Sequence, residues 1–185
     1  MNNFNLHTPT RILFGKGAIA ELREQIPAGA RVLVTYGGGS VKKTGVLDQV
    51  LSALAGFDVL EFGGIEPNPS YETLMNAVKL AREENVTFLL AVGGGSVLDG
   101  TKFIAAAAHY DANIDPWEIL ETYGSKITRA IPMGSVLTLP ATGSESNKGA
   151  VISRKTTGDK RAFMSEHVQP VFAILDPVYT YTLPP

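Results

Sequence analysis

The sequence reads RVLVTYGGGSV at residues 31–41 and TFLLAVGGGSV at residues 87–97. In each stretch an apolar run rich in β-branched residues, which is typical of a buried strand, leads into three glycines and a serine. Helical patterns follow at residues 40–55, which are amphipathic, and 96–109, which are mostly apolar. The chain therefore contains two copies of a strand–glycine turn–helix unit.

The rest of the chain continues this alternation. Short apolar runs at residues 58–62, 136–139 and 171–175 predict three more strands, and residues 70–85 predict another amphipathic helix. Strands that alternate with helices form mainly parallel sheets with helices on both faces. We therefore expect a Rossmann-like, doubly wound α/β fold, with residues 1–185 as one nucleotide-binding domain.

Two segments depart from the pattern. Residues 4–7 and 11–14 flank Thr8-Pro9-Thr10 and predict a small N-terminal extended arm or hairpin. Residues 140–170 are rich in Thr, Ser, Gly and Lys and predict an excursion with a hairpin around Thr157-Gly158-Asp159.

Composition narrows the class of protein. The 185 residues are 44% hydrophobic and 18% charged, as expected for a folded domain. A net charge of −2, with no basic stretch longer than Lys42-Lys43, argues against nucleic acid as a partner. The absence of cysteine excludes disulfides and thiolate chemistry. With no visible signal peptide and no apolar run of about 18 residues, we expect a cytoplasmic protein without a membrane contact.

The glycine turns point to a phosphate-bearing ligand. Glycine lets backbone N–H groups approach a phosphate closely, and the helix N-terminus that follows adds partial positive charge. Ser40 and Ser96 are expected to cap these helices. Either turn alone is equally well explained as a tight strand–helix connection, but two at equivalent places favour a nucleotide cofactor.

The glycine spacing leaves the type of nucleotide open. The dinucleotide pattern G-x-G-x-x-G is not met, because Leu98 stands where the third glycine belongs. Residues 95–100 spell G-x-x-x-x-G, but Thr101-Lys102 reverses the order that a phosphate-binding P-loop requires. A phosphotransferase with a distorted P-loop is therefore one alternative. The serine-hydrolase pattern G-x-S-x-G is absent.

The first turn bears on the choice between NADP and NAD. Folds that bind NAD commonly place an acidic residue after the strand that meets the adenosine ribose, where it binds the 2′-hydroxyl. No acid follows residues 31–36; Ser40, Lys42 and Lys43 come instead. An uncharged turn with a hydroxyl and nearby lysines suits a 2′-phosphate and favours NADP(H), unless the lysines simply point into water.

Four motifs in order carry a family resemblance: Phe14-Gly15-x-Gly17, Glu66-Pro67-Asn68-Pro69, Gly93-Gly94-Gly95-Ser96-x-x-Asp99-x-x-Lys102 and Leu139-Pro140-Ala141-Thr142-Gly143-Ser144-Glu145. Together they resemble the metal-containing ("iron-containing") alcohol dehydrogenase family, in its butanol-dehydrogenase branch. The resemblance covers essentially the whole chain. It implies an oxidoreductase whose Rossmann-like N-terminal domain holds NADP(H) and whose helical C-terminal domain holds a divalent metal, zinc or iron.

The resemblance also implies positions along the cofactor. Asp99 would lie by the nicotinamide carboxamide and Lys160 by the nicotinamide ribose; neither is assigned a catalytic role. Without the family, Asp99 reads as a helix cap with Ser96, and Lys160 as a solvated lysine of the hairpin. The full set of expected cofactor-binding residues is Gly37, Gly38, Gly39, Ser40, Asn68, Gly93, Gly94, Gly95, Ser96, Asp99, Thr138, Thr142, Asn147, Lys160, Tyr179 and Leu183.

The family's metal ligands, one Asp and three His, begin with an Asp-x-x-x-His turn that this chain lacks. We therefore expect no metal site here, with the metal-binding domain absent from the chain. The intact enzyme would reduce small aldehydes to alcohols with NADPH, whereas this chain would bind the cofactor without turnover. The alternative function is a non-catalytic nucleotide-binding module. The resemblance also implies a possible homodimer through residues 4–14.

Overall fold

A computed structural model describes residues 7–182 of the chain. Its helices and strands follow one another in the order β1 (Arg11–Phe14), η1 (Ala18–Glu21), α1 (Leu22–Gln25), β2 (Arg31–Tyr36), α2 (Ser40–Lys43), α3 (Val46–Ala53), β3 (Asp58–Phe62), α4 (Tyr71–Glu83), β4 (Phe88–Gly94), α5 (Gly95–Ala108), α6 (Glu118–Glu121), β5 (Met133–Leu139), β6 (Gly149–Arg154), β7 (Asp159–Met164), η2 (Glu166–Val168), β8 (Phe172–Leu175) and η3 (Pro177–Thr182).

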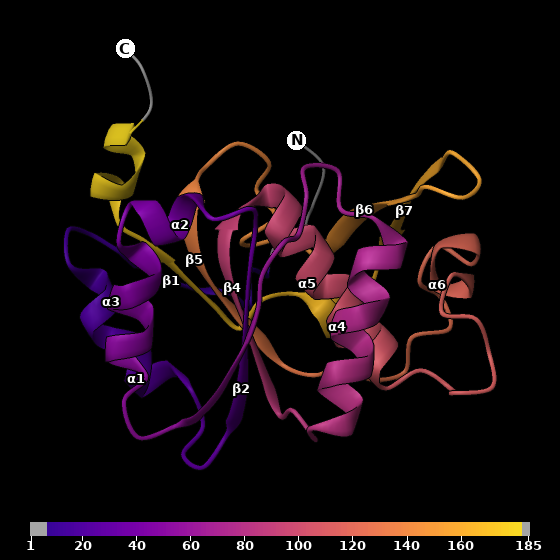
Figure 1. The fold of residues 1–185 in the computed structure, drawn as a ribbon, viewed down its shortest axis with the longest axis horizontal. Coiled ribbons are helices and arrows are strands. Elements are labelled where there is room, and N and C mark those ends of the chain that lie inside the picture. Colours follow the sequence, from indigo (N-terminus) through magenta and orange to yellow (C-terminus); the bar gives the residue numbers. More distant parts are fainter. Residues whose placement is uncertain (1–6, 183–185) are drawn as a thin grey trace, which may run out of the picture.

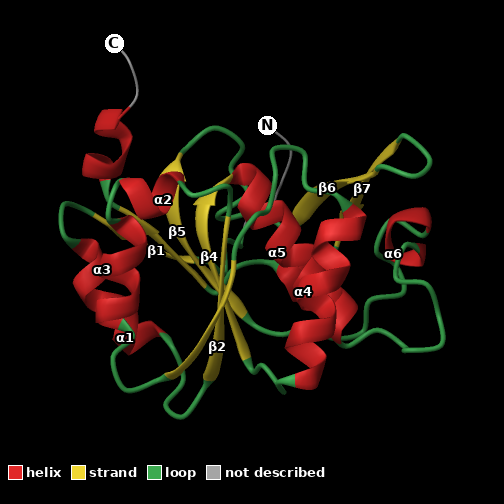
Figure 2. Cartoon of the chain, viewed as in Figure 1, coloured by secondary structure: helices red, strands yellow, loops and turns green. Residues whose placement is uncertain are grey.

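Six of these strands form one sheet in the order β1-β8-β5-β4-β2-β3, and every neighbouring pair is parallel. Helices lie on both sides of the sheet in the cartoon (Figure 2). The Rossmann-like α/β fold is therefore confirmed. A parallel sheet needs such coverage, because crossover connections place helices on its faces.

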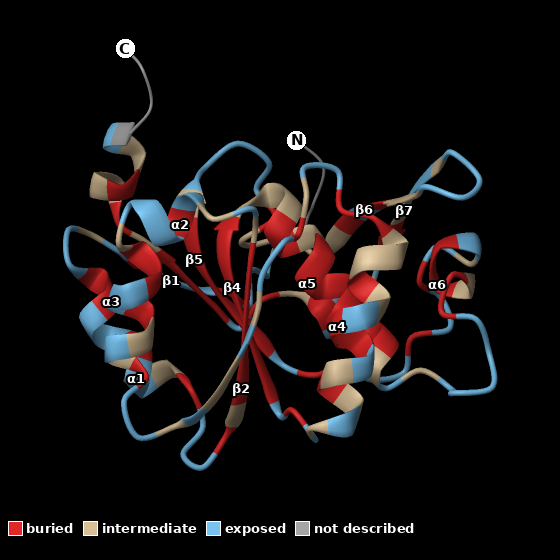
Figure 3. Ribbon diagram, viewed as in Figure 1, coloured by how far each residue is buried: buried red, intermediate tan, exposed pale blue. Residues whose placement is uncertain are grey.

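The side chains of β4 show how the sheet divides two cores. Leu89 and Ala91 belong to the cluster that includes α4 and α5, whereas Leu90 and Val92 belong to the cluster that includes α3 and η1. This alternation follows from the two-residue period of a strand. In Figure 1, α1, α2 and α3 lie on one side of the sheet and α4 and α5 on the other. The inner strands β2, β4, β5 and β8 are mostly buried, whereas the edge strands β1 and β3 are largely exposed or half-buried (Figure 3).

The predicted helix over residues 40–55 is two helices. The chain turns at Thr44 and Gly45, where Gly45 has a φ of +73° that favours glycine over any residue with a Cβ. The expected serine caps are wrong as well. Gly39 and Gly94 occupy the N-cap positions, and Ser40 and Ser96 lie inside the first turn of α2 and α5.

The predicted N-terminal arm needs a correction at residues 11–14. These residues form β1, the edge strand of the main sheet. β1 pairs in parallel with β8, with Ile12 opposite Ala173 and Leu13 opposite Ile174. Residues 4–6 of the proposed arm lie outside the described residues. The expected hairpin is confirmed: β6 and β7 form a separate antiparallel pair with Gly158 in its turn.

Within residues 7–182, no helix has both the length and the apolar character that a membrane span requires.

Candidate cofactor-binding site

The two glycine turns lie beside each other at the carboxyl ends of the adjacent parallel strands β2 and β4. Tyr36 at the end of β2 is in register with Val92 of β4, so each glycine run leaves the sheet at the same level. The helices that follow β2 and β4 pack on opposite faces. The connections therefore diverge between these two strands, and in open α/β sheets such a switch point opens the crevice in which ligands bind.

The second turn is closed on one side by a loop. A Cβ on Gly95 would lie 2.5 Å from Thr142 Oγ1, well inside van der Waals contact, so only glycine fits here. The ladder between β4 and β5 also shifts register at Gly93 and Gly94. Gly95 begins the 14-residue α5, whose first backbone N–H groups are left for a ligand or solvent. The expected residues Gly93, Gly94, Gly95 and Ser96 thus form one compact cradle.

The first turn is open. Gly38 and Ser40 are exposed, and a Cβ added to Gly38 would meet no atom within 4 Å. Gly39 has a φ of +112°, which favours glycine.

A cation stands beside the first turn, as expected. Lys42 Nζ lies 5.0 Å from the centroid of the Tyr36 ring, and the Tyr36 hydroxyl donates to Glu61 Oε2 at 3.1 Å. The hydrogen bond with Tyr36 raises the pKa of Lys42. Lys42 is exposed to solvent, but its ammonium group lies over the Tyr36 ring beside the turn and remains charged at neutral pH.

Asn68 and Lys160 are brought together from distant parts of the chain. Lys160 Nζ on β7 donates to Asn68 Oδ1 at 2.8 Å, and Asn68 holds a left-handed φ of +55° between two prolines. The family resemblance implies that Asn68 contacts the adenosine part of the cofactor, whereas Lys160 contacts the nicotinamide ribose. The direct contact puts them at one place, so one of the two assignments would require this hydrogen bond to open.

Asp99 is a tether between two segments. Its Oδ1 accepts from Ser144 Oγ at 2.7 Å, and its Oδ2 accepts from the Val151 N–H at 3.0 Å. The reading of Asp99 as a helix cap is therefore wrong. Asp99 and Asn147 share a cavity of about 420 Å³, which is also lined by Tyr123, Thr142, Ser144, Gly149, Ala150, Val151, Ala162, Phe163 and Met164.

Two other expected residues, Thr138 and Tyr179, lie in different surroundings. Thr138 is half-buried near the end of β5. Tyr179 on η3 is buried, and its hydroxyl donates to Gln49 Oε1 on α3 at 3.1 Å. It lines a separate cavity of about 310 Å³ that also includes Thr44, close to the first turn. Leu183 lies outside the described residues.

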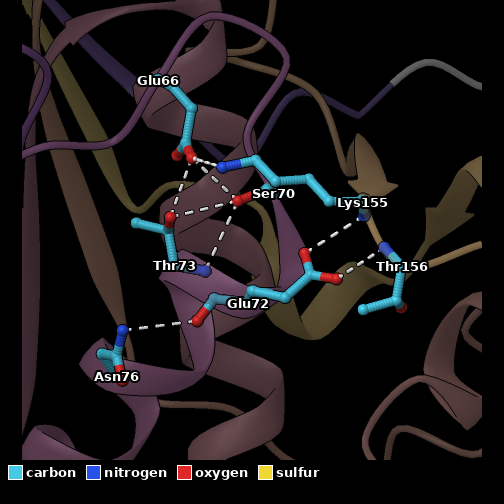
Figure 4. Close-up of polar contacts among 7 residues, drawn as sticks. All are labelled: Glu66, Ser70, Glu72, Thr73, Asn76, Lys155 and Thr156. Atoms are coloured by element: carbon cyan, nitrogen blue, oxygen red, sulfur yellow. Dashed lines mark hydrogen bonds and ion pairs between the residues drawn. The ribbon is translucent and has the colours of Figure 1, made fainter. Parts of the chain in front are cut away.

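A second tether holds the hairpin against the loop that carries Asn68 (Figure 4). Glu66 Oε1 accepts from Lys155 Nζ at 2.6 Å, and from the hydroxyls of Ser70 and Thr73 at 2.8 Å each. Glu72 accepts from the backbone N–H groups of Lys155 and Thr156. These bonds fix the hairpin turn to the first turn of α4.

The tether changes the acidity of Glu66. Burial acts to raise the pKa of this carboxyl, but the hydrogen bonds from Lys155, Thr73 and Ser70 outweigh burial and lower the pKa to about 2. Glu66 is therefore ionised at all physiological pH values, and the tether is intact there.

Sequence reasoning missed two residues that organise the site, Lys102 and Glu66. Both stood in quoted motifs without a role. The signal for Lys102 was a single lysine inside the apolar run of residues 97–108, a position where a lysine is fully buried only when it is paired. Glu66 carried no comparable signal, because its partner Lys155 is 89 residues away.

Over the described range 7–182, no three His, Asp or Glu side chains gather as a metal site would require. The residues there do not fit the metal that the resemblance implies.

The parallel sheet and the two glycine turns define a Rossmann-like α/β domain. The model of the iron-containing alcohol dehydrogenase family matches residues 9–177, and the chain belongs to this family.

Two of its relatives, a reductase and a dehydrogenase, carry different cofactors in their names. The NADPH-dependent aldehyde reductase YqhD of Escherichia coli (strain K12) is 85% identical over the whole chain, which spans 48% of that protein. A probable NADH-dependent butanol dehydrogenase of Bacillus subtilis (strain 168) is 49% identical over the whole chain, again 48% of the relative. The chain thus spans about half the length of these curated relatives.

Two solved structures of dehydrogenases and reductases share the fold of this chain. The crystal structure of E. coli K-12 YqhD matches with a TM-score of 0.97 and 85% identity over 99% of this chain and 47% of that one. The NADH-dependent butanol dehydrogenase A of Thermotoga maritima matches with a TM-score of 0.92 and 43% identity over 100% of this chain and 46% of the other.

Proposed function

We propose that this chain is the NADP(H)-binding domain of an aldehyde reductase, and that the whole protein reduces small aldehydes to alcohols. The observation that carries the proposal is the pair of glycine turns at the switch point between β2 and β4. The name of the 85% identical relative, an NADPH-dependent aldehyde reductase, supports the reaction and the cofactor.

The parts of the site suit different parts of the cofactor. The cradle at Gly95 and the N-terminus of α5 would hold the pyrophosphate, because free N–H groups and the helix dipole favour an anion. The first turn, with Ser40 and Lys42, would hold the 2′-phosphate. The cavity shared by Asp99 and Asn147 would hold the nicotinamide end.

The bound cofactor would supply the hydride. The chain's own residues bind and orient it: the tethers at Asp99 and Glu66 hold the hairpin and its preceding loop beside the crevice. Some relatives with the same fold carry NADH, not NADPH, in their names. The preference of this chain for NADPH over NADH is therefore the part of the proposal that most needs a test.

Gly38→Asp tests this preference. The new side chain enters open space, so the fold should be unaffected, while its carboxylate would repel a 2′-phosphate. We expect the affinity for NADPH, measured by fluorescence titration, to fall roughly tenfold or more relative to NADH, a loss of about 1.4 kcal/mol.

Gly38→Asn is the matched control, because it has nearly the same size and no charge. It should leave the ratio of the two affinities close to that of the unsubstituted chain. Equal ratios in Gly38→Asp and Gly38→Asn would remove the first turn from the choice of cofactor.

A further inference from the structure

Among the lysines and arginines that the structure describes, Lys102 is the most deeply buried, with none of its surface exposed. It lies on α5, two turns after the glycine cradle, among apolar neighbours that include Phe103 and Ile104. A lysine in such a place is costly unless all of its donors are satisfied. Neither the family resemblance nor the proposed function assigns it a role.

The ammonium group of Lys102 donates three hydrogen bonds, all to residues between 144 and 149. Lys102 Nζ donates to Ser144 Oγ at 2.9 Å, to Asn147 Oδ1 at 2.9 Å and to the Gly149 carbonyl oxygen at 2.8 Å. A lysine ammonium has three donors and no acceptor, so this set is complete. Lys102 therefore binds the β5–β6 connection to the helix that begins at the cradle.

The network extends from Lys102 to Asp99. Ser144, which accepts from Lys102, donates its own hydrogen to Asp99 Oδ1. The charged groups that face Lys102 are Asp99 on its own helix and Glu145 on the connection. The lysine thus sets the direction of the Ser144 hydroxyl and, through it, the position of the Asp99 carboxylate.

Lys102 also fixes the orientation of the Asn147 amide. Asn147 Oδ1 accepts from Lys102 Nζ and from the Gly149 N–H at 2.9 Å. Both partners are donors, so the atom between them must be the oxygen. The amide nitrogen Nδ2 is then the group that Asn147 offers to a ligand in the shared cavity.

We propose that Lys102 is a positioning residue for the nicotinamide end of the cofactor. It orients a donor, Asn147 Nδ2, and an acceptor, the Asp99 carboxylate, in one cavity. A primary carboxamide has one acceptor oxygen and an NH₂ donor, so it is complementary to that pair. This inference rests on the proposed function, since it names the residue that prepares the same site for its cofactor.

The charge state of Lys102 gives the proposal a pH dependence. Burial lowers the pKa of Lys102 to about 8, although Asp99 and Glu145 act to raise it. Loss of a proton leaves two donors for three acceptors, and the orientation of Asn147 or Ser144 is released. We expect the Kd for NADPH to rise above about pH 8, by up to tenfold per pH unit.

The test compares two ligands on the same chain. NADPH reaches the nicotinamide cavity, whereas adenosine 2′,5′-bisphosphate occupies only the adenosine part. In Lys102→Met we expect at least tenfold weaker binding of NADPH, unchanged binding of the bisphosphate, and no rise of Kd between pH 7 and pH 9.5. Lys79→Met, an exposed lysine of α4, is the matched control and should behave as the unsubstituted chain.

Ser144→Ala provides a second variant, because it keeps the charge of Lys102 and removes the hydroxyl that joins the lysine to Asp99. It should also weaken NADPH binding selectively. Should Lys102→Met not fold, as shown by its circular dichroism, Ser144→Ala carries the test alone. Equal loss of both ligands, or no loss of either, would overturn the proposal. If the unsubstituted chain does not bind NADPH, the proposed function fails and this inference fails with it.

Discussion

At the scale of single residues, the contact between Gly95 and Thr142 ties the shape of the cradle to a loop that is 47 residues away in the chain (142 minus 95). A Cβ at Gly95 would meet both Oγ1 and Cγ2 of Thr142, at 2.5 and 2.8 Å. One added methyl group must therefore move either the start of α5 or this loop.

Gly95→Ala should destabilise the chain by about 1–3 kcal/mol, as overpacking does in a well-packed site. Affinity for NADPH should fall as well, because the displaced backbone no longer matches the pyrophosphate. Urea unfolding and a fluorescence titration measure the two effects. The double variant Gly95→Ala/Thr142→Ala should recover part of the lost stability; if it recovers none, the contact is not the cause.

At the scale of elements, the β6–β7 hairpin is held by charge at its turn and by burial near its base. Glu66 and Glu72 bind Lys155 and Thr156 at the turn, and Ile152 and Phe163 are fully buried in the core that includes α5. The turn contacts depend on ionised carboxylates, whereas the buried side chains do not. Acid should therefore loosen the turn first.

Glu66 should make stability depend on pH between about 4.5 and about 2. Its pKa is lower in the folded chain than the ordinary 4.5, so the unfolded chain binds more protons and stability falls as pH falls through this window. With Lys155 largely exposed, solvent screens the pair, and we expect the tether to contribute at most about 1 kcal/mol at pH 6.

Urea unfolding at pH 6 and pH 3 measures this contribution. Glu66→Gln should lose stability at pH 6 and lie closer to the unsubstituted chain at pH 3. The control is Glu24→Gln, which alters an exposed carboxyl of α1. If Glu66→Gln lowers the free energy of unfolding as much at pH 3 as at pH 6, the stabilisation does not come from the charge of Glu66.

Elements were predictable where the pattern is local. The strands at residues 31–36 and 58–62 and the hairpin around Gly158 follow from apolar runs and turn residues, and the structure confirms them. β1 was mistaken for an arm because a four-residue edge strand has a weak pattern and its partner, β8, is about 160 residues away. The glycines of the site were predictable for the same local reason, whereas the Glu66–Lys155 and Lys102–Asn147 contacts depend on long-range packing.

At the scale of the whole molecule, the strand order brings the parts of the site together. β2 and β4 are adjacent, and their helices leave on opposite faces, so the two glycine turns share one crevice. The hairpin is hydrogen-bonded to α5 through Asp99 and to α4 through Glu72, and the β5–β6 connection is hydrogen-bonded to α5 through Ser144. Both segments border the same end of the sheet. This arrangement is the reason that a cofactor is expected there and not elsewhere on the surface.

Hydrogen exchange of the 185-residue chain with and without NADPH tests this claim most directly. We predict slower exchange at residues 37–40, 93–96 and 142–149, with little change elsewhere. Protection confined to the cavity of about 340 Å³ at the other end of the sheet, which includes Arg82 and His109, would contradict the account. Unchanged exchange at both glycine turns under saturating NADPH would contradict it equally.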